Sequence, residues 1–236
     1  MASWIVHLRI AENLLGDFPA LEPVHFAVGS TAPDLGIPDK NWEYFDPTYT
    51  VTRFCEDRLF SLSTDLDFYC KYIQGLDPAI DTQQSSFLWG YFCHLVTDNL
   101  WNEIRKSTYE KYKERFDTDK EFAWEVKKDW YGLDHLYIRQ HPDCLFWTVF
   151  LNCEYCDDYL DLIPAKALHV RVDYIRKYYQ EDDEKIRAMM NRPFEYLSKV
   201  HMNQFVENSS IKIAEWMRRL QNGDPAFNTL ESVTQT

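Results

Sequence analysis

Glycine is scarce in this chain. Only 7 of the 236 residues are glycine, against an average usage of roughly 7% in proteins. Because glycine supplies the backbone conformations of tight turns, this scarcity argues against a fold of many short strands and favours long helices. The chain also lacks a run of about 20 apolar residues, so we expect no stable membrane insertion. It has no basic start followed by a small-residue cleavage site, so we expect a cytoplasmic protein.

Positive charge is in short supply as well. Lysine and arginine number 25 against 38 aspartate and glutamate residues, which gives a formal net charge of -13. Nucleic acids and anionic membranes both bind cationic protein faces, so we expect neither as a partner. Hydrophobic residues make up 45% of the chain and aromatic residues 16%, which excludes disorder. A single domain with a sizeable core is therefore expected.

Helical periodicity dominates what is present. Apolar residues recur at intervals of three and four over 3–16, where Ser3 is placed to cap the helix. Further helices are expected over 52–74, 84–107, 118–131, 142–160, 164–180 and 181–221, the last interrupted at Pro193. Residues 17–50 hold five of the ten prolines and are expected to form mostly irregular loop. The prediction is an all-α, single-domain multi-helix bundle over 1–222, followed by a polar, frayed tail over 223–236.

Three segments place metal-competent side chains where a core helix would favour apolar ones. His94 and Asp98 are four residues apart, so an imidazole and a carboxylate share one helix face and can reach the same divalent cation. Gly90 lies one turn earlier on that face and leaves room for another backbone or a ligand to approach. His7 lies on the apolar face of the first expected helix, and Asp34 follows a proline in the irregular segment. Such groups are costly in an apolar core unless they are paired or bound to metal.

Each of these features also has a plain structural explanation. A histidine and an aspartate at this spacing can form an ion pair within a core, and His7 can be a core histidine that is hydrogen-bonded to backbone. The hypothesis of a metal centre therefore rests on the three segments together, which supply two imidazoles and two carboxylates.

The same residues carry a resemblance to a known family. The three segments are Trp-Ile-Val-His7-Leu-x-Ile-Ala11, Phe26-x-Val-Gly29-Ser30-x-Ala-Pro33-Asp34 and Gly90-Tyr-x-x-His94-Leu-x-Thr-Asp98-Asn-x-Trp101. They resemble the bacterial zinc-dependent phospholipase C family and the fungal single-strand nucleases that are similar to it. The motifs cover about the first 105 residues, and the expected helices are compatible with the family over the rest.

The resemblance implies an all-α fold that hydrolyses phosphodiesters with a cluster of up to three zinc ions. By this resemblance His7, Asp34, His94 and Asp98 are zinc ligands. Asp98 would bridge two metals, and Asp34 would also accept the proton of the attacking water. For this chain we expect one or two zinc ions, and a small or lipid-like phosphodiester as substrate, since the net charge disfavours a polyanionic one.

The chain departs from the family pattern at Arg53. The family places a further histidine, often after a threonine, between the Pro-Asp loop and the His-x-x-x-Asp helix. Here Thr52-Arg53-Phe54 stands where Thr-His-Phe is expected, and no histidine occurs over 26–93. A guanidinium is always protonated and cannot bind zinc. Arg53 is therefore predicted either to pair with Asp34 or Asp98 in place of a metal's charge, or to clamp a phosphate beside a remaining metal.

The remaining histidines give no clean match to the family's later ligands. His169 and Asp173 have the spacing of a His-x-x-x-Glu pair, but the charge of Arg171 between them indicates a surface helix. His135 and His141 are candidate further ligands, each expected on a partly exposed turn.

Three hypotheses of function follow. The first is a zinc-dependent hydrolase of a phosphodiester, with Asp34 and Arg53 as catalytic residues. The second is a family member that has lost catalysis and acts as a helical binding or scaffold protein, with Arg53 replacing a metal ligand. The third is a metal-dependent phosphohydrolase of the HD type, for which the chain offers only Asp134-His135, in reverse order. Pairing of Arg53 with both Asp34 and Asp98, with no metal between them, would favour the second.

Overall fold

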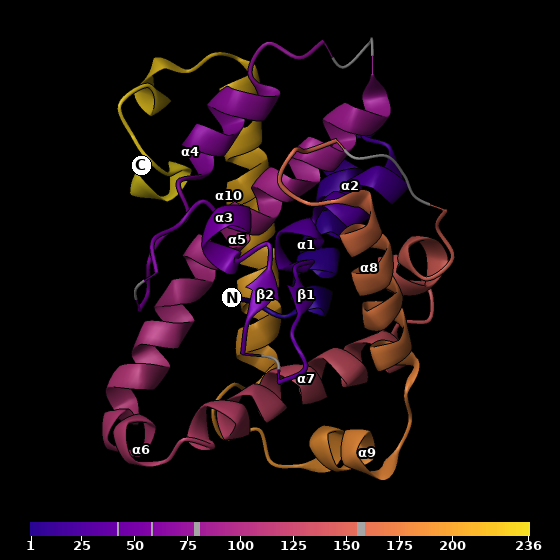
Figure 1. The fold of residues 1–236 in the computed structure, drawn as a ribbon, viewed down its shortest axis with the longest axis vertical. Helices are drawn as coiled ribbons and strands as arrows, with labels where there is room; N and C mark the ends of the chain where they lie inside the picture. Colours follow the sequence, from indigo (N-terminus) through magenta and orange to yellow (C-terminus); the bar gives the residue numbers. More distant parts are fainter. Residues whose placement is uncertain (42, 58, 78–80, 155–158) are drawn as a thin grey trace.

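The fold is built almost entirely from helices (Figure 1). The computed structural model describes residues 1–41, 43–57, 59–77, 81–154 and 159–236. The helices in these ranges are α1 (Trp4–Asp17), α2 (Pro23–Gly29), α3 (Tyr49–Thr52), α4 (Asp65–Phe68), α5 (Thr82–Lys111), α6 (Lys113–Thr118), α7 (Phe122–Gln140), α8 (Ala165–Gln180), α9 (Glu184–Asn191) and α10 (Lys199–Gln221). None of the helices described here combines the length and apolarity needed to cross a membrane. The expectation of an all-α fold is confirmed.

Short turns and one small sheet connect the helices. The strands β1 (Ile37–Pro38) and β2 (Phe45–Asp46) pair antiparallel, with Ile37 opposite Asp46. Single 3-10 turns cover Ala32–Asp34, Pro225–Phe227 and Val233–Gln235, and π-helical turns cover Tyr69–Ile73 and Phe146–Phe150. The segment 17–50, which we expected to be mostly irregular, therefore also contains α2 and the start of α3.

The start of α1 is fixed by a contact with α7. Ser3 has an extended backbone at the N-cap position, but its side chain makes no capping hydrogen bond. Its hydroxyl instead donates to Oδ1 of Asp134 at 2.8 Å. The predicted capping role of Ser3 is therefore wrong, because a buried carboxylate requires hydrogen-bond donors and takes this one.

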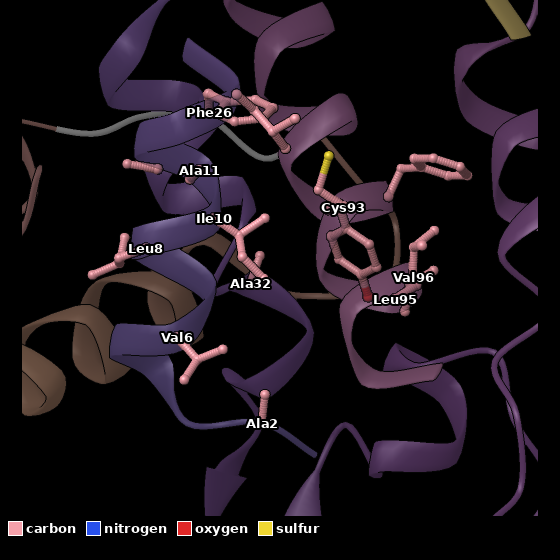
Figure 2. Packing of buried hydrophobic residues seen from close by; sticks show 14 of the residues in the cluster. Ala2, Val6, Leu8, Ile10, Ala11, Phe26, Ala32, Cys93, Leu95 and Val96 are labelled. Atoms are coloured by element: carbon pink, nitrogen blue, oxygen red, sulfur yellow. The ribbon is translucent and has the colours of Figure 1, made fainter. Parts of the chain in front are cut away.

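The core surrounds α1 and α5. Every residue from 85 to 99 on α5 is buried, and α5 packs against both α1 and α2. Figure 2 shows Ile10 of α1 and Cys93 of α5 among the side chains that fill the space around these helices. Asp81 caps α5 by accepting the N–H of Gln84 at 2.8 Å. The helix predicted over 84–107 is confirmed and is longer at both ends.

Two glycines allow the backbones of α2 and α5 to touch. A Cβ atom on Gly90 would lie 2.8 Å from the nitrogen of Ser30 and would also meet the carbonyl oxygen of Phe26. A Cβ atom on Gly29 would overlap the carbonyl group of Phe87. The expectation that Gly90 admits another backbone is confirmed, and the close approach brings Ser30 beside α5.

The helix expected over 52–74 forms only in its second part. There α4 continues into the π-helical turn at Tyr69–Ile73. Phe54 and Phe60 have φ angles of 51° and 59°, and this left-handed conformation interrupts a right-handed helix. Leu59, expected on the buried face of that helix, is 63% exposed.

The helix expected over 142–160 is replaced by the π-helical turn at Phe146–Phe150, while 155–158 lie outside the described residues. Arg176 of α8 accounts for where the turn stops. Its Nε donates to the carbonyl oxygen of Phe150 at 2.9 Å, and its Nη2 donates to that of Cys153 at 2.7 Å. A side chain from another helix therefore satisfies carbonyl groups that a longer helix would have paired internally.

The second half of the chain follows the predicted helices more closely. The helix expected over 118–131 is α7, which begins at Phe122 and continues to Gln140, and α8 matches 164–180. The break expected at Pro193 separates α9 from α10. In Figure 1, α7 crosses the lower part of the molecule with α9 against it, and α10 packs on α1.

The segment after α10 is ordered, although we expected it to fray. Asp65 is fully buried and accepts hydrogen bonds from the Ser232 hydroxyl at 2.5 Å and from the Val233 N–H at 3.0 Å. Asn99 of α5 also donates to Asp65, at 2.8 Å. The prediction of a frayed tail is wrong because buried polar groups of the bundle require these partners.

Candidate metal centre

Three of the four predicted zinc ligands meet in the core. They are His7 of α1 with His94 and Asp98 of α5, and one ligand atom from each lies within 4.8 Å of the other two. All three side chains are buried. Within the part of the chain that the structure describes, no other three histidine, cysteine or carboxylate side chains converge in this way.

His94 is oriented by a backbone group of Ser30, the residue that follows α2. Its Nδ1 lies 2.9 Å from the carbonyl oxygen of Ser30, which can only accept a hydrogen bond, so Nδ1 carries the proton. Its Nε2 lies 3.5 Å from an oxygen of Asp34 and 3.5 Å from an oxygen of Asp98, and makes no hydrogen bond to any described residue. Charge-assisted hydrogen bonds are shorter, at about 2.7–2.9 Å. A metal-ligating histidine commonly donates its other ring N–H to such a carbonyl group.

The spacing of the ligand atoms matches a metal site better than a hydrogen-bonded cluster. Zinc binds nitrogen and oxygen at about 2.0–2.1 Å, so neighbouring ligands of a tetrahedral ion lie about 3.4 Å apart. Nε2 of His7 lies 3.6 Å from Oδ1 of Asp98, and Nε2 of His94 lies 3.5 Å from Oδ2. Neither ring nitrogen of His7 has a hydrogen-bond partner among the described residues. These donor types suit a divalent ion, but the two imidazole rings are parallel, so one ring must turn before both lone pairs meet at a single ion.

The two imidazole rings are stacked, with their centres 3.7 Å apart and their planes 6° from parallel. Burial and the neighbouring His94 lower the pKa of His7 to about 4, so His7 is neutral and its lone pair is available. Burial also opposes the charged form of His94, but Asp34 and Asp98 outweigh it and raise its pKa to about 9. Metal binding would therefore release a proton from His94.

Asp98 joins the buried cluster to the surface. Its Oδ1 accepts the N–H of Ala2 at 2.7 Å, which fixes the carboxylate. Asp98 also lines a cleft of about 470 Å³, together with Arg53 and Tyr49. Of the three residues of the cluster, Asp98 is the one in the lining of this cleft.

Asp34 and Arg53 form an ion pair at the edge of the cluster. Nη2 of Arg53 donates to Oδ1 of Asp34, and its Nε lies 3.5 Å from Oδ2 of Asp98. The hydroxyl of Thr52 donates to the carbonyl oxygen of Pro33 at 2.8 Å, which holds α3 against the 3-10 turn that carries Asp34. Arg53 thus contacts both carboxylates that the sequence offered as its partners.

The ion pair changes the chemistry expected of Asp34. Burial alone would raise its pKa, but Arg53 and then His94 hold it well below the usual range. A carboxylate that is so strongly held in its ionised form is a weak proton acceptor. This argues against the role of base that we expected for Asp34, and favours a role in positioning Arg53.

The other histidines lie away from this cluster. His135 is buried in α7, which corrects its expected place on an exposed turn, and Arg139 donates to its Nδ1 at 3.1 Å. The adjacent Asp134 accepts from Ser3 and Tyr179, so the side chains required by the third hypothesis are engaged with other partners. Partly exposed His141 lies at the end of α7, and exposed His169 lies on α8.

Sequence reasoning missed two backbone groups of the site. The N–H of Ala2 orients Asp98, and the carbonyl of Ser30 orients His94. The type of a residue does not reveal which contacts its backbone groups make. The one available signal was Gly90, whose spacing from His94 indicated that another backbone would come close.

Comparisons with protein-family models, with curated proteins and with solved structures give no match for this chain.

Proposed function

We propose that the protein is a zinc-dependent hydrolase of a small or lipid-like phosphodiester, with an all-α fold of the phospholipase C type. His7, His94 and Asp98 would hold the zinc ion. The observation that carries the proposal is His94, whose Nδ1 is occupied by Ser30 while its buried Nε2 faces two carboxylates at 3.5 Å without a hydrogen bond. A metal ion at Nε2 would take the place of the proton that His94 otherwise carries between these two carboxylates.

A bound zinc ion supplies two effects, since it lowers the pKa of a water to about 7 and polarises a phosphoryl oxygen. The protein's own groups supply orientation and charge. Ala2 and Ser30 fix Asp98 and His94, and the walls of the cleft admit a small ligand. Arg53 has five N–H donors, of which its contacts with the two carboxylates use only some, so others can stabilise negative charge that develops on a phosphoryl group.

Arg53 also favours one zinc ion over a cluster. Its guanidinium contacts both Asp34 and Asp98, and it supplies positive charge where a second ion would need to share these carboxylates. The proposed centre is therefore mononuclear, with Arg53 beside the metal.

Hydrolysis of bis(4-nitrophenyl) phosphate tests the proposal. The wild-type protein should release nitrophenolate when zinc is added and lose this activity in a chelator. His94→Ala should be inactive under both conditions, whereas His169→Ala, which removes an exposed histidine on α8, should match the wild type. Equal rates in the wild type and His94→Ala would refute the proposed site.

A second function is favoured by the Arg53 contacts alone. With His94 protonated, the charges of Arg53 and His94 balance those of Asp34 and Asp98, and the site is neutral without a metal. The chain would then act as a helical binding or scaffold protein. Failure of the wild type both to bind zinc and to hydrolyse the ester would select this function over the hydrolase.

A further inference from the structure

One face of α5 carries a tyrosine beside the residues of the proposed metal centre. Tyr91, His94 and Asp98 follow one another at intervals of three and four residues, so they share this face. Tyr91 is fully buried, and its hydroxyl donates to the carbonyl oxygen of Thr52, the last residue of α3. The helix that supplies two of the proposed zinc ligands therefore also contacts the backbone beside Arg53.

This contact fixes the peptide unit that joins Thr52 to Arg53, whose atoms lie in one rigid plane. The carbonyl group of the unit accepts from Tyr91. Its N–H, which belongs to Arg53, donates to the carbonyl oxygen of Tyr49 at 2.8 Å. Hydrogen bonds on both sides of the plane set its orientation, and with it the place of the Cα atom from which the Arg53 side chain extends.

The residue after Arg53 is held against the same tyrosine through a phenylalanine. The ring of Phe54 packs edge-on against Phe68, with ring centres 5.4 Å apart. Phe68 stacks in turn on the ring of Tyr91, with centres 4.5 Å apart and planes 8° from parallel. Both neighbours of Arg53 along the chain are thus linked to Tyr91, one through its hydroxyl and the other through its ring.

We propose that Tyr91 is a positioning residue, which holds the guanidinium of Arg53 where it stabilises charge on a phosphoryl group. This inference rests on the proposed function, in which Arg53 has that role. Without the hydroxyl of Tyr91 the buried carbonyl group of Thr52 loses this hydrogen bond, and the peptide plane before Arg53 is free to turn. A displacement of about 1 Å in a catalytic group lowers a rate by up to about a hundredfold.

NMR of the Arg53 side chain tests the positioning role in the metal-free protein. In isotope-labelled wild-type protein the Nε–H of Arg53 should behave as a rigid group, because the guanidinium pairs with Asp34 and lies beside Asp98. Arg53→Lys identifies its signal by removing it. In Tyr91→Phe, which keeps the ring, the heteronuclear NOE of this group should fall, and its exchange with water should become about tenfold faster or more.

Tyr69→Phe is the matched control for the loss of a hydroxyl. Tyr69 is also a tyrosine whose hydroxyl donates to a backbone carbonyl, that of Leu220 in α10, at 3.2 Å. Its substitution should leave the Arg53 signal as in the wild type.

Steady-state hydrolysis of bis(4-nitrophenyl) phosphate by the zinc-loaded protein gives the second readout. Tyr91→Phe should lower kcat about tenfold with little change in KM, because Arg53 acts on charge that develops in the transition state. Zinc affinity should stay that of the wild type, since the three proposed ligands keep their own contacts. A merely structural defect would instead weaken zinc binding in Tyr91→Phe and leave the Arg53 signal rigid in the folded protein.

An Arg53 signal that is equally rigid in the wild type and Tyr91→Phe would overturn the positioning role. So would an active enzyme whose kcat is the same with and without the Tyr91 hydroxyl. The test is separate from that of the proposed function. A protein that hydrolyses no ester but releases Arg53 in Tyr91→Phe has the structural link without the hydrolase. A protein whose hydrolysis depends on His94, but whose Arg53 stays rigid in Tyr91→Phe, has the hydrolase without this positioning residue.

Discussion

The sequence indicated that Arg53 belongs to the site, but it did not indicate which groups Arg53 contacts. The chain has an arginine where the family that it resembles has a histidine. This indicated that Arg53 either supplies positive charge in place of a metal ion or holds a phosphate group. The structure adds that the guanidinium touches both Asp34 and Asp98. The contact depends on α3 docking against the turn at Ala32–Asp34, which is a tertiary event that no local pattern encodes.

Replacement of Arg53 by methionine measures its role as a charge partner. The variant leaves Asp34 and Asp98 without a buried cation, so in a chelator its free energy of unfolding should fall by about 3–5 kcal/mol. Added zinc should recover part of this loss, since it supplies positive charge at the same carboxylates. Urea unfolding with and without zinc gives both values.

Arg187→Met is the control for that experiment. It removes a largely exposed arginine paired with Asp182 and should change the free energy of unfolding by no more than about 1 kcal/mol. A loss in Arg53→Met as small as that of the control would show that the buried ion pair does not hold the site together.

Asp134 links stability to pH. Burial raises its pKa to about 7, although Tyr179 and Ser3 donate hydrogen bonds to it. The folded protein therefore binds a proton that the unfolded chain releases above about pH 4, and stability falls as the pH rises from about 4 to about 7. In Asp134→Asn this fall should be smaller by up to about 4 kcal/mol, since one pKa unit corresponds to about 1.4 kcal/mol.

Urea unfolding at about pH 5 and about pH 8 captures about 3 kcal/mol of this difference, because the part between about pH 4 and about pH 5 lies outside the interval. The exposed Asp143→Asn variant should keep the pH dependence of the wild type. An Asp134→Asn variant whose free energy of unfolding changes with pH as the wild type's does would contradict the assignment.

At the scale of the element, the contact between α2 and α5 sets the geometry of the metal centre. The backbones meet at Gly29 and Gly90, and this contact delivers the carbonyl of Ser30 to His94. The role of Gly90 was predictable because it lies one turn before His94. The role of Gly29 was not, because its partner, the backbone of Phe87, is far away in sequence.

Gly90→Ala should destabilise the protein by about 1–3 kcal/mol or more, because the added methyl group overlaps the backbone of α2. It should also weaken zinc binding by displacing Ser30. Gly16→Ala, near the end of α1, has nothing within 4 Å of the added atom and should be neutral or stabilising by up to about 1 kcal/mol. Thermal unfolding of both variants is the measurement, and equal stabilities would refute the close contact.

Elements were predictable where the helical period was long and unbroken. α1, α5 and α8 match their predicted ranges closely, because the same residues that favour a helix also form the buried face. The prediction failed over 52–74, where Phe54 and Phe60 adopt left-handed conformations that only the surrounding fold supports. It failed again over 142–160, where Arg176 of α8 donates hydrogen bonds to carbonyl groups that a longer helix would have paired internally.

At the scale of the whole molecule, the sequence indicated which residues meet in the core better than it indicated what surrounds them. Residues 7, 94 and 98 converge as the motifs predicted, with Asp34 at the edge of the cluster. The cleft and the place of Arg105 in its lining were not predicted. Arg105 shares a face of α5 with Asp98, but that face lines a cleft only because residues of α3 and of the segment after it form the opposite wall.

The positions of the charged residues refine the interpretation of the net charge. Most carboxylates of this acidic chain lie on the surface, and the cleft beside the proposed metal centre is lined by both signs of charge, with Arg53 and Arg105 beside Glu56, Asp57 and Asp98. The net charge of -13 disfavours polyanions. It is consistent with the expectation that nucleic acid is not a partner.

Zinc stoichiometry tests the central claim most directly. Protein purified without added metal, saturated with zinc, dialysed and analysed by inductively coupled plasma mass spectrometry should retain one zinc ion per chain. His94→Ala should retain none, and His169→Ala should match the wild type. The absence of stoichiometric zinc from the wild type, or equal zinc in the wild type and His94→Ala, would contradict the account.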